Sequence, residues 1–251
     1  MIFEFMNGGL SYDPATVVAA TSQNLIWVLG ACALSFTGAY MQYFGALSMG
    51  FKHRTYSIPL ICNLWNFAHD TTFVMNFHHW FYEVDWWMVK AFWFALVVFA
   101  ICECVVMYQL LRYGRQDVFP GMSLGQATAS YIGLQIFMYG VFWWLLAMIH
   151  DPYYLIMFST ATVLAPAFNI SLMRARGSRK GYSTTMLVGY VFLCAGFWLW
   201  MLQIDPFFRS PFIWMIALGS TGMAVAGVFV FRGLPEYKPE PDAAYAAPVR
   251  A

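Results

Sequence analysis

The polar residues of one apolar stretch have the types and spacing that proton chemistry needs. Asn66 and Asp70 are four residues apart, so a helix places them on one face. Asn63 and His69 lie close to that face. An unpaired ionisable group in hydrocarbon costs roughly 2.5–3.5 kcal/mol on insertion scales. A chain that keeps Asp70 at such a depth therefore either pairs it tightly or uses it.

Two interpretations of this cluster stay open. In the first, Asn66, His69 and Asp70 form a polar clamp that holds helices together, as amides and imidazoles often do in membrane bundles. In the second, burial keeps Asp70 protonated, so that it acts as a general acid while His69 and Asn66 orient it. Glu103, inside another apolar segment, is either a structural hydrogen-bonding group or a second catalytic carboxyl group.

Aromatic residues supply the predicted binding surface. They make up 20% of the chain, and each ring that faces a carbocation stabilises it by about 0.5–2 kcal/mol. The candidate substrate-binding residues are Trp65, Trp80, Trp86, Trp87 and Asp205. Asp151 and Asp205 each precede a proline, which first indicates the start of a turn, although either could face the mouth of a cavity.

The run His78-His79, with Glu83 and Asp85 after it, has metal-binding residue types but matches the spacing of no established site. Contact with lipid headgroups is the favoured interpretation. A metal-assisted oxygenase that uses His69, His78 and His79 is the third hypothesis. Five histidines without repeated His motifs exclude the membrane di-iron hydroxylases and desaturases. We expect no metal and no cofactor.

The composition predicts an integral membrane protein. Of 251 residues, 61% are hydrophobic and 10% charged, whereas soluble domains carry about 25% charged residues. The net charge of +1 gives no reason to expect nucleic-acid binding. The last apolar segment has no lysine for a Schiff base, which excludes a retinal-binding receptor.

Seven apolar segments of roughly 20 residues predict an all-α bundle that crosses the bilayer seven times, because each segment matches a hydrocarbon core of about 30 Å. The expected spans are 23–43, 56–77, 87–111, 126–149, 153–173, 183–204 and 212–231. Residues 1–231 then form one transmembrane domain. Residues 232–251 are expected to form a disordered cytoplasmic tail.

The loops predict the orientation of this bundle. If the spans alternate, eleven of the thirteen Lys and Arg residues fall on one side, at positions 52, 54, 112, 115, 174, 176, 179, 180, 232, 238 and 250. The positive-inside rule places that side in the cytoplasm, with the N-terminus outside and the C-terminus inside. The expected location is a bacterial inner membrane or the endoplasmic reticulum.

Several short motifs point to a known family. Tyr56-x-x-Pro-Leu60 opens the second span, and Asn63-Leu-Trp-Asn-Phe67 follows it. Glu103 precedes Tyr108–Arg115 in the third span, and a further pattern consists of Ser171, Met173, Arg176, Ser178, Gly181 and Ser183. With the size and span count, these motifs resemble the small seven-span membrane terpene cyclases of fungal meroterpenoid and indole-diterpene pathways and their bacterial homologues.

The resemblance implies an acid-catalysed lyase or isomerase of isoprenoids, but the chain departs from the family at the acids. The family's acid in the second span aligns with Asn66, whose amide does not deliver a proton at a useful pH. Residues 212–231 lack the family's second acid. Asp70, one turn after Asn66, would supply a displaced donor, and Glu103 or Asp205 the second carboxyl group.

The sequence therefore leaves two main hypotheses. The first is an integral membrane enzyme that cyclises, isomerises or hydrates an isoprenoid or another lipophilic substrate by acid catalysis. The alternative is a non-catalytic lipid-binding or transport protein on the same scaffold. In both, the expected partners are the lipid bilayer and a lipophilic small molecule.

Overall fold

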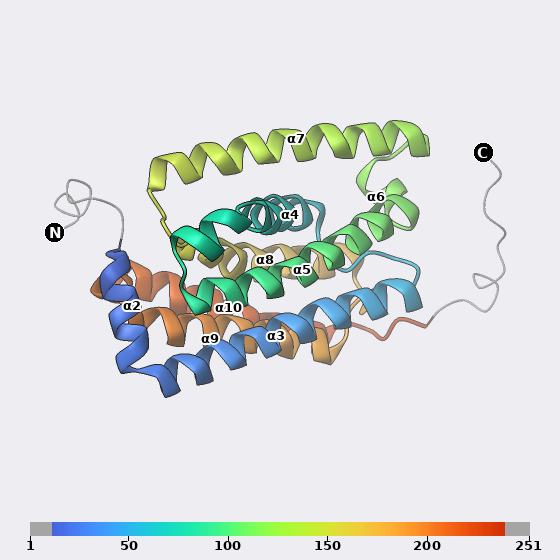
Figure 1. Cartoon of the computed structure of the whole chain (residues 1–251). Coiled ribbons are helices and arrows are strands. Elements are labelled where there is room, and N and C mark those ends of the chain that lie inside the picture. Colours follow the sequence, from blue (N-terminus) through green and yellow to red (C-terminus); the bar gives the residue numbers. More distant parts are fainter. Residues whose placement is uncertain (1–11, 239–251) are drawn as a thin grey trace.

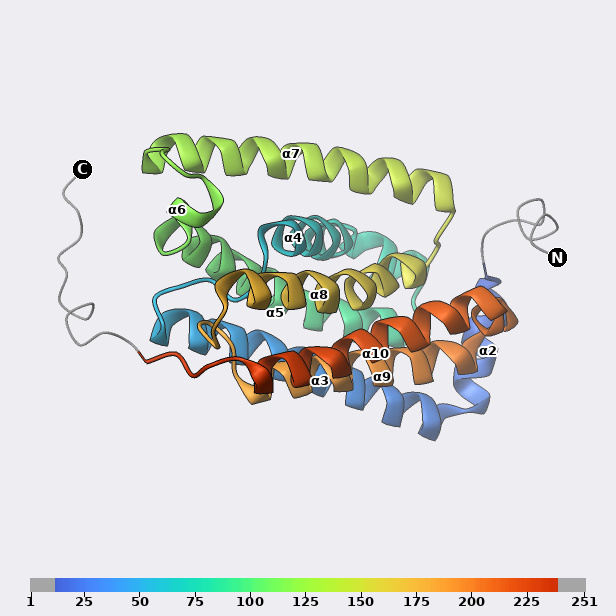
Figure 2. The same cartoon turned by 180° about the vertical axis from the view of Figure 1, so that it is seen from behind.

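The computed structural model describes residues 12–238, and every regular element within them is a helix. The elements are α2 (Pro14–Gln23), α3 (Leu25–Lys52), α4 (Leu60–Met75), the π-helix η1 (His79–Glu83), α5 (Trp87–Arg112), α6 (Arg115–Val118), α7 (Leu124–Ile149), α8 (Leu155–Arg176), α9 (Thr184–Ile204), the 3₁₀-helix η2 (Pro206–Arg209) and α10 (Pro211–Gly233). The long helices run side by side along the molecule, and α2 crosses one end of them (Figures 1 and 2).

Six helices among the described residues are long and apolar enough to cross a membrane. They are α3, α5, α7, α8, α9 and α10. The prediction of an all-α, multi-pass membrane protein is confirmed at this level. Helix α4, in the predicted second span, has only 16 residues and is not among the six. After Met75 the chain makes one turn and continues through η1 to Glu83.

Local sequence signals explain where several helices begin. Ser123 starts α7 with a reciprocal capping box, in which Gln126 is the partner. Ser183 accepts a hydrogen bond from a backbone N–H in the first turn of α9. Asp13 does the same for α2, where Pro14 takes the first helical position. Gly177 ends α8 in the left-handed conformation, with φ of 60°.

Helices α3 and α9 are packed backbone to backbone at glycines. A Cβ atom on Gly38 would lie 2.2 Å from the nitrogen of Leu193 and 2.5 Å from the carbonyl oxygen of Gly189. A Cβ atom on Gly196 would lie 2.4 Å from the nitrogen of Ser35. Small residues allow such close approach of membrane helices, because packing rather than the hydrophobic effect drives their association. We call this contact the glycine seam.

Helix α7 lies on the outside of the bundle, above α4 in Figure 1, and polar side chains join the two helices. The hydroxyl groups of Thr71 and Tyr139 are 2.5 Å apart. The indole of Trp143 donates to Thr72 at 3.0 Å, and Gln135 donates to the carbonyl oxygen of Leu64 at 3.0 Å. The polar residues of α4 therefore serve partly as helix clamps.

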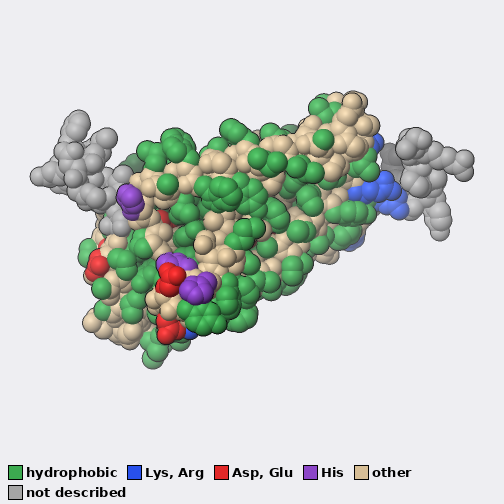
Figure 3. All heavy atoms as spheres, turned by 45° about the horizontal axis from the view of Figure 1, so that its top comes forward, with side chains coloured by type: hydrophobic (Ala, Val, Ile, Leu, Met, Phe, Trp, Pro, Cys, Tyr) green, Lys and Arg blue, Asp and Glu red, His purple; other side chains and the backbone are tan. Residues whose placement is uncertain are grey.

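The two ends of the bundle carry different charges. Acidic and histidine side chains gather at one end and blue basic side chains at the other in Figure 3. The loops and helix ends at the basic end contain Lys52, Arg54, Arg112, Arg115, Arg174, Arg176, Arg179, Lys180, Arg232 and Lys238. The other end contains Asp13, His78, His79, Glu83, Asp85, His150, Asp151, Asp205 and Arg209.

The chain beyond α10 begins by lying against the loop between α8 and α9. The backbone nitrogen of Arg179 donates to the carbonyl oxygen of Pro235 at 3.1 Å. Its guanidinium donates to the carbonyl oxygens of Phe231 and Arg232 at 3.0 and 2.9 Å. The rest of the tail expected from residue 232, at 239–251, lies outside the described residues.

Candidate functional site

A cavity of about 90 Å³ lies between five helices in the middle of the bundle. Helices α3, α4, α5, α8 and α9 all contribute to its wall. Its polar side consists of Gln42, Tyr43, Asn66, His69 and Asp70. The prediction that Asn66 and Asp70 share a helix face is confirmed, because both line this cavity together with His69.

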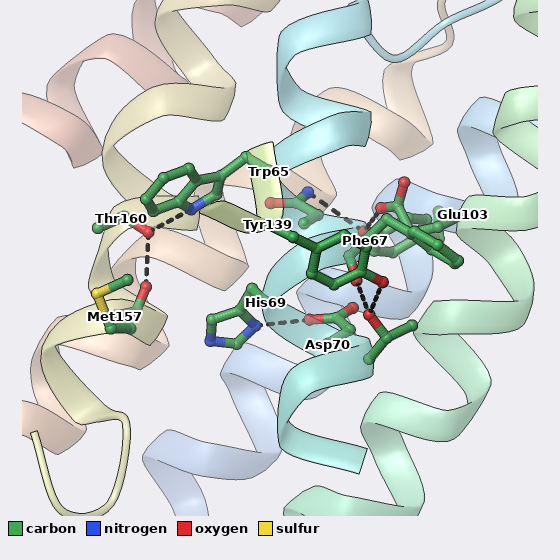
Figure 4. A network of polar contacts seen from close by, with 11 residues as sticks. Trp65, Phe67, His69, Asp70, Glu103, Tyr139, Met157 and Thr160 are labelled. Carbon is green, nitrogen blue, oxygen red and sulfur yellow. Dashed lines mark hydrogen bonds and ion pairs between the residues drawn. The ribbon is translucent and has the colours of Figure 1, made fainter. Parts of the chain in front are cut away.

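Asp70 and His69 form a buried pair on α4. The Nδ1 atom of His69 lies 2.7 Å from Oδ1 of Asp70, and each residue is 4% exposed (Figure 4). The Nε2 atom of His69 is buried and has no hydrogen-bond partner among residues 12–238. A carboxylate on one ring nitrogen fixes the tautomer of a neutral imidazole and leaves the other nitrogen as an acceptor.

Glu103 lies behind the cavity wall at the centre of a polar network that joins four helices. Its carboxyl oxygens are hydrogen-bonded to the Tyr43 hydroxyl from α3 and the Asn63 amide from α4. Asn63 also accepts from the Tyr131 hydroxyl of α7 at 2.7 Å. Asn66 donates to the Tyr43 oxygen at 3.3 Å, which links the network to the cavity.

Tyr43 and Tyr131 are the members of this network that the sequence did not reveal, and Tyr43 is the one that lines the cavity. Tyr43 contacts Glu103 with its hydroxyl group, whereas Glu103 is fully buried and does not line the cavity. Fifteen tyrosines occur in the chain, and nothing in the spacing of Tyr43 distinguishes it from the others. Its contact depends on the approach of α3 to α5.

The rest of the cavity wall is mainly aromatic. It includes Phe36, Phe92, Phe99, Phe158, Phe197 and Trp200. The rings form a continuous series: His69 and Phe158 have centroids 4.6 Å apart, Phe158 and Phe92 5.4 Å, and Phe92 and Trp200 5.2 Å. An aromatic wall beside a polar cluster was expected, and the wall comes largely from phenylalanines.

The four predicted binding tryptophans do not line this cavity. Trp65 donates to Thr160 at 2.7 Å (Figure 4), and Trp80 donates to the carbonyl oxygen of Phe73 at 2.7 Å. Trp86 is buried against Tyr153, and Trp87 is 46% exposed. Trp65 and Trp80 therefore hold neighbouring segments together through hydrogen bonds that their indole nitrogens donate.

Asp151 and Asp205 organise turns at the acidic end. Asp205 accepts from the nitrogen of Phe207 at 2.7 Å and begins η2, as expected for a turn starter. Asp151 accepts from the Tyr12 hydroxyl at 2.6 Å and from the nitrogen of Met157 at 2.8 Å. Burial raises the pKa of the Asp151 carboxyl above its ordinary value and outweighs these hydrogen bonds, which lower it.

The connector at the acidic end pairs its histidines with one carboxylate. The Nδ1 atoms of His78 and His79 lie 3.2 and 2.7 Å from the two carboxyl oxygens of Glu83. The side chain of Glu83 is 58% exposed, so this pairing lies at the surface of the bundle. Asp85 pairs with Lys90. Residues 12–238 contain no group of three or more His, Cys, Asp or Glu residues that could hold a metal ion.

Comparison of the chain with protein-family models, curated proteins and solved structures gives no match. The resemblance to seven-span terpene cyclases therefore depends on the motifs quoted above. What the site can do must be argued from its own geometry.

Proposed function

We propose that the chain crosses the membrane seven times, with its basic end in the cytoplasm. The seventh crossing is α4 together with its continuation through η1, residues 60–83. At about 1.5 Å per residue, 24 residues reach the thickness of a hydrocarbon core. The separation of charge between the two ends of the bundle supports this orientation (Figure 3).

We further propose an integral membrane enzyme that acts on an isoprenoid or another lipophilic substrate by proton transfer. One observation carries this proposal: the same cavity is lined by aromatic rings and by the His69–Asp70 pair, with Glu103 one hydrogen bond behind its wall. The rings would stabilise a cationic intermediate, and the carboxyl groups and imidazole would exchange protons with it. Cyclisation or isomerisation of an alkene fits this combination.

The size of the cavity limits which part of the substrate it can hold. Its volume is about 90 Å³, and an engineered protein cavity that binds benzene measures about 150 Å³. A whole isoprenoid chain does not fit. We therefore propose that the reactive end of the substrate enters the cavity, while the rest of the chain lies between helices or in lipid.

The test is turnover by Asp70→Asn protein in membranes, assayed against a panel of prenyl alcohols, prenylated aromatics and their epoxides. We expect wild-type membranes to convert a member of the panel and the variant to lose at least 100-fold in rate. Tyr139→Phe, which removes a hydroxyl outside the cavity, is the matched control and should retain activity. An Asp70→Asn protein with full activity would contradict the assignment.

One observation favours the alternative, a non-catalytic lipid-binding or transport protein. Glu103, Asn63, Tyr43 and Tyr131 join α3, α4, α5 and α7, which is what a structural clamp does. This alternative predicts that the purified protein carries a co-extracted lipid and forms no product from any member of the panel. Mass spectrometry of the extracted lipids would distinguish the two functions.

A further inference from the structure

The cavity faces two separate proton-exchanging groups rather than one. On α4, His69 is bound to Asp70 through Nδ1, and its Nε2 atom has no partner in the part of the chain that the structure describes. On the other side, the Tyr43 hydroxyl links the cavity to Glu103. No hydrogen bond among the described side chains joins the His69–Asp70 pair to the Tyr43–Glu103 pair. The two pairs are therefore separate hydrogen-bonding units, although the charge on Asp70 is close enough to act on Glu103 and Tyr43.

The two pairs differ in what they offer to a ligand. In the His69–Asp70 pair, an ionised Asp70 accepts a hydrogen bond from Nδ1 of His69, which leaves Nε2, a buried atom without a partner among the described residues, as an acceptor. In the other pair, the Tyr43 oxygen is contacted by the Asn66 amide and by Glu103. With an ionised Glu103, the Tyr43 hydroxyl donates to the carboxylate. With a protonated Glu103, the carboxyl group donates instead, and the Tyr43 hydroxyl hydrogen is available to a ligand in the cavity.

The geometry points to a division of labour at the site of the proposed function: Glu103 supplies a proton through Tyr43, and His69, positioned by Asp70, removes one. The Tyr43 hydroxyl proton moves to an alkene carbon of the ligand as the Glu103 carboxyl proton moves to the Tyr43 oxygen. A C–H proton of the resulting cation then moves to Nε2 of His69, and its electron pair forms the new double bond. Loss of the proton from His69 to water and uptake of one proton from water by Glu103 reset the site.

This assignment reverses the roles expected from the sequence, where Asp70 is the acid and His69 orients it. It also restricts the reaction class within the proposed function. Because protons gained and lost are equal, the product is an isomer of the substrate, open-chain or cyclised, that keeps a double bond. Addition of water is not part of this sequence of steps. In the assignment Tyr43 and His69 touch the ligand, whereas Asp70 is a positioning residue.

Infrared spectroscopy of the protein in detergent tests where the carboxyl proton resides, without any substrate. A buried protonated carboxyl group gives a C=O stretching band that ionised carboxylates lack. We expect a band that disappears in Glu103→Gln and persists in Asp70→Asn. Tyr43→Phe should shift this band to higher frequency, because the carboxyl group loses a hydrogen bond. Loss of the band in Asp70→Asn and its persistence in Glu103→Gln would overturn the inference.

Nitrogen NMR of the imidazoles tests the other pair. With ¹⁵N-labelled histidine, the His69 signal is identified by its loss in His69→Gln among the five histidines. We expect a neutral ring with the proton on Nδ1, and a change in the tautomer ratio in Asp70→Asn. A proton on Nε2 in the wild type would overturn the inference. Tyr131→Phe, which alters the Glu103 network away from the cavity, is the control and should leave the His69 signal unchanged.

These measurements separate the inference from the proposed function. If the spectra agree but no substrate of the panel is converted, the proton arrangement stands and the enzyme proposal fails. If a substrate is converted, the reaction in D₂O should place one deuterium on carbon in the product. If a substrate is converted but the spectra assign the proton to Asp70, the proposed enzymatic function stands. The division of labour between Glu103 and His69 is then rejected.

Discussion

Asn63 is the residue on which the central polar network depends most. Its amide nitrogen contacts the Glu103 carboxyl group and its oxygen accepts from Tyr131, so it satisfies groups on two neighbouring helices while being fully buried. Leaving a buried polar group without a partner costs about 1–3 kcal/mol. An isolated clamp residue would have a smaller effect, since a typical hydrogen bond contributes only about 0.5–1.5 kcal/mol net.

We therefore expect Asn63→Ala to lower the free energy of unfolding by about 2–4 kcal/mol, since two buried groups lose their partners. Unfolding in mixed micelles with increasing denaturing detergent measures this. Asn24→Ala is the control, because the Asn24 side chain donates to the carbonyl oxygen of Ala20 in α2, the helix that it directly follows. Equal losses in the two variants would contradict the role given to Asn63.

Asp151 should make stability depend on pH in a direction that can be checked. Burial raises its pKa in the folded state above the ordinary value of 3.8. The stabilisation from its neutral form is fully present below that ordinary value and is lost as the pH rises through the raised pKa. We expect the Tm of the wild type, relative to Asp151→Asn, to fall as the pH rises from about 4 to about 8.

Asp13 supplies the control with the opposite sign. Hydrogen bonds from Thr16 lower its pKa, so its stabilisation is present above the ordinary value and is lost as the pH falls. The Tm of the wild type relative to Asp13→Asn should then stay constant from about pH 8 to about pH 5 and fall as the pH drops below about 4. Parallel pH profiles for the two variants would contradict both assignments.

At the residue scale, the sequence singled out the polar residues of α4 and Glu103 on α5, and it missed Tyr43 and the cavity phenylalanines. The four-residue spacing of Asn66 and Asp70 was sufficient, because helical periodicity determines which residues share a face. Glu103 was singled out since a carboxyl group in an apolar segment is costly. Tyr43 and the cavity phenylalanines carry no such signal, because a neutral aromatic residue is compatible with lipid, core or cavity.

At the element scale, the sequence predicted a helix accurately where the apolar segment and the helix have the same ends. Helix α5 begins at Trp87 and ends at Arg112, within one residue of the expected span. Helix α3 continues to Lys52, nine residues beyond the expected end, because residues 44–52 remain compatible with a helix after a bilayer has been crossed. Helix α2 was not expected, although Asp13-Pro14 is a recognisable start signal.

The glycine seam gives a sharp prediction at this scale. Gly38→Ala places a methyl group against the backbone of α9, so the two helices must separate. We expect a loss of about 1–3 kcal/mol or more in the free energy of unfolding. Gly140→Ala on α7 is the matched control, because a Cβ atom there meets nothing within 4 Å. That variant should be unchanged or more stable by about 0.5–1 kcal/mol.

The free energies of unfolding of Gly38→Ala and Gly140→Ala are measured under the same conditions. Once a ligand has been identified, its binding to the two variants is compared as well. Cavity residues on α3 and α9, among them Tyr43 and Trp200, should shift when the seam is forced apart. A Gly38→Ala protein as stable as the wild type would show that the helices separate at no cost. The seam would then not determine the position of the cavity wall.

At the scale of the whole molecule, the separation of charge predicts which end faces the cytoplasm. Single cysteines introduced at Tyr82, which is 69% exposed, and at Gln116 lie at opposite ends of the bundle. A membrane-impermeant maleimide should label Tyr82→Cys in intact cells, and Gln116→Cys only after the membrane is permeabilised. The unaltered chain, with its five cysteines, gives the background. Labelling in the reverse order would contradict the proposed orientation.

The seam also determines how remote members of this fold could be found. Gly38 and Gly45 on α3, like Gly189 and Gly196 on α9, are seven residues apart, and a Cβ atom on any of them would come within about 3 Å of the facing helix. A chain that exchanged its acids for other chemistry could keep the same scaffold, but it could not lengthen these four side chains without moving two helices. Paired glycines at this interval in the segments that correspond to α3 and α9 would therefore be a more durable search pattern than the polar residues.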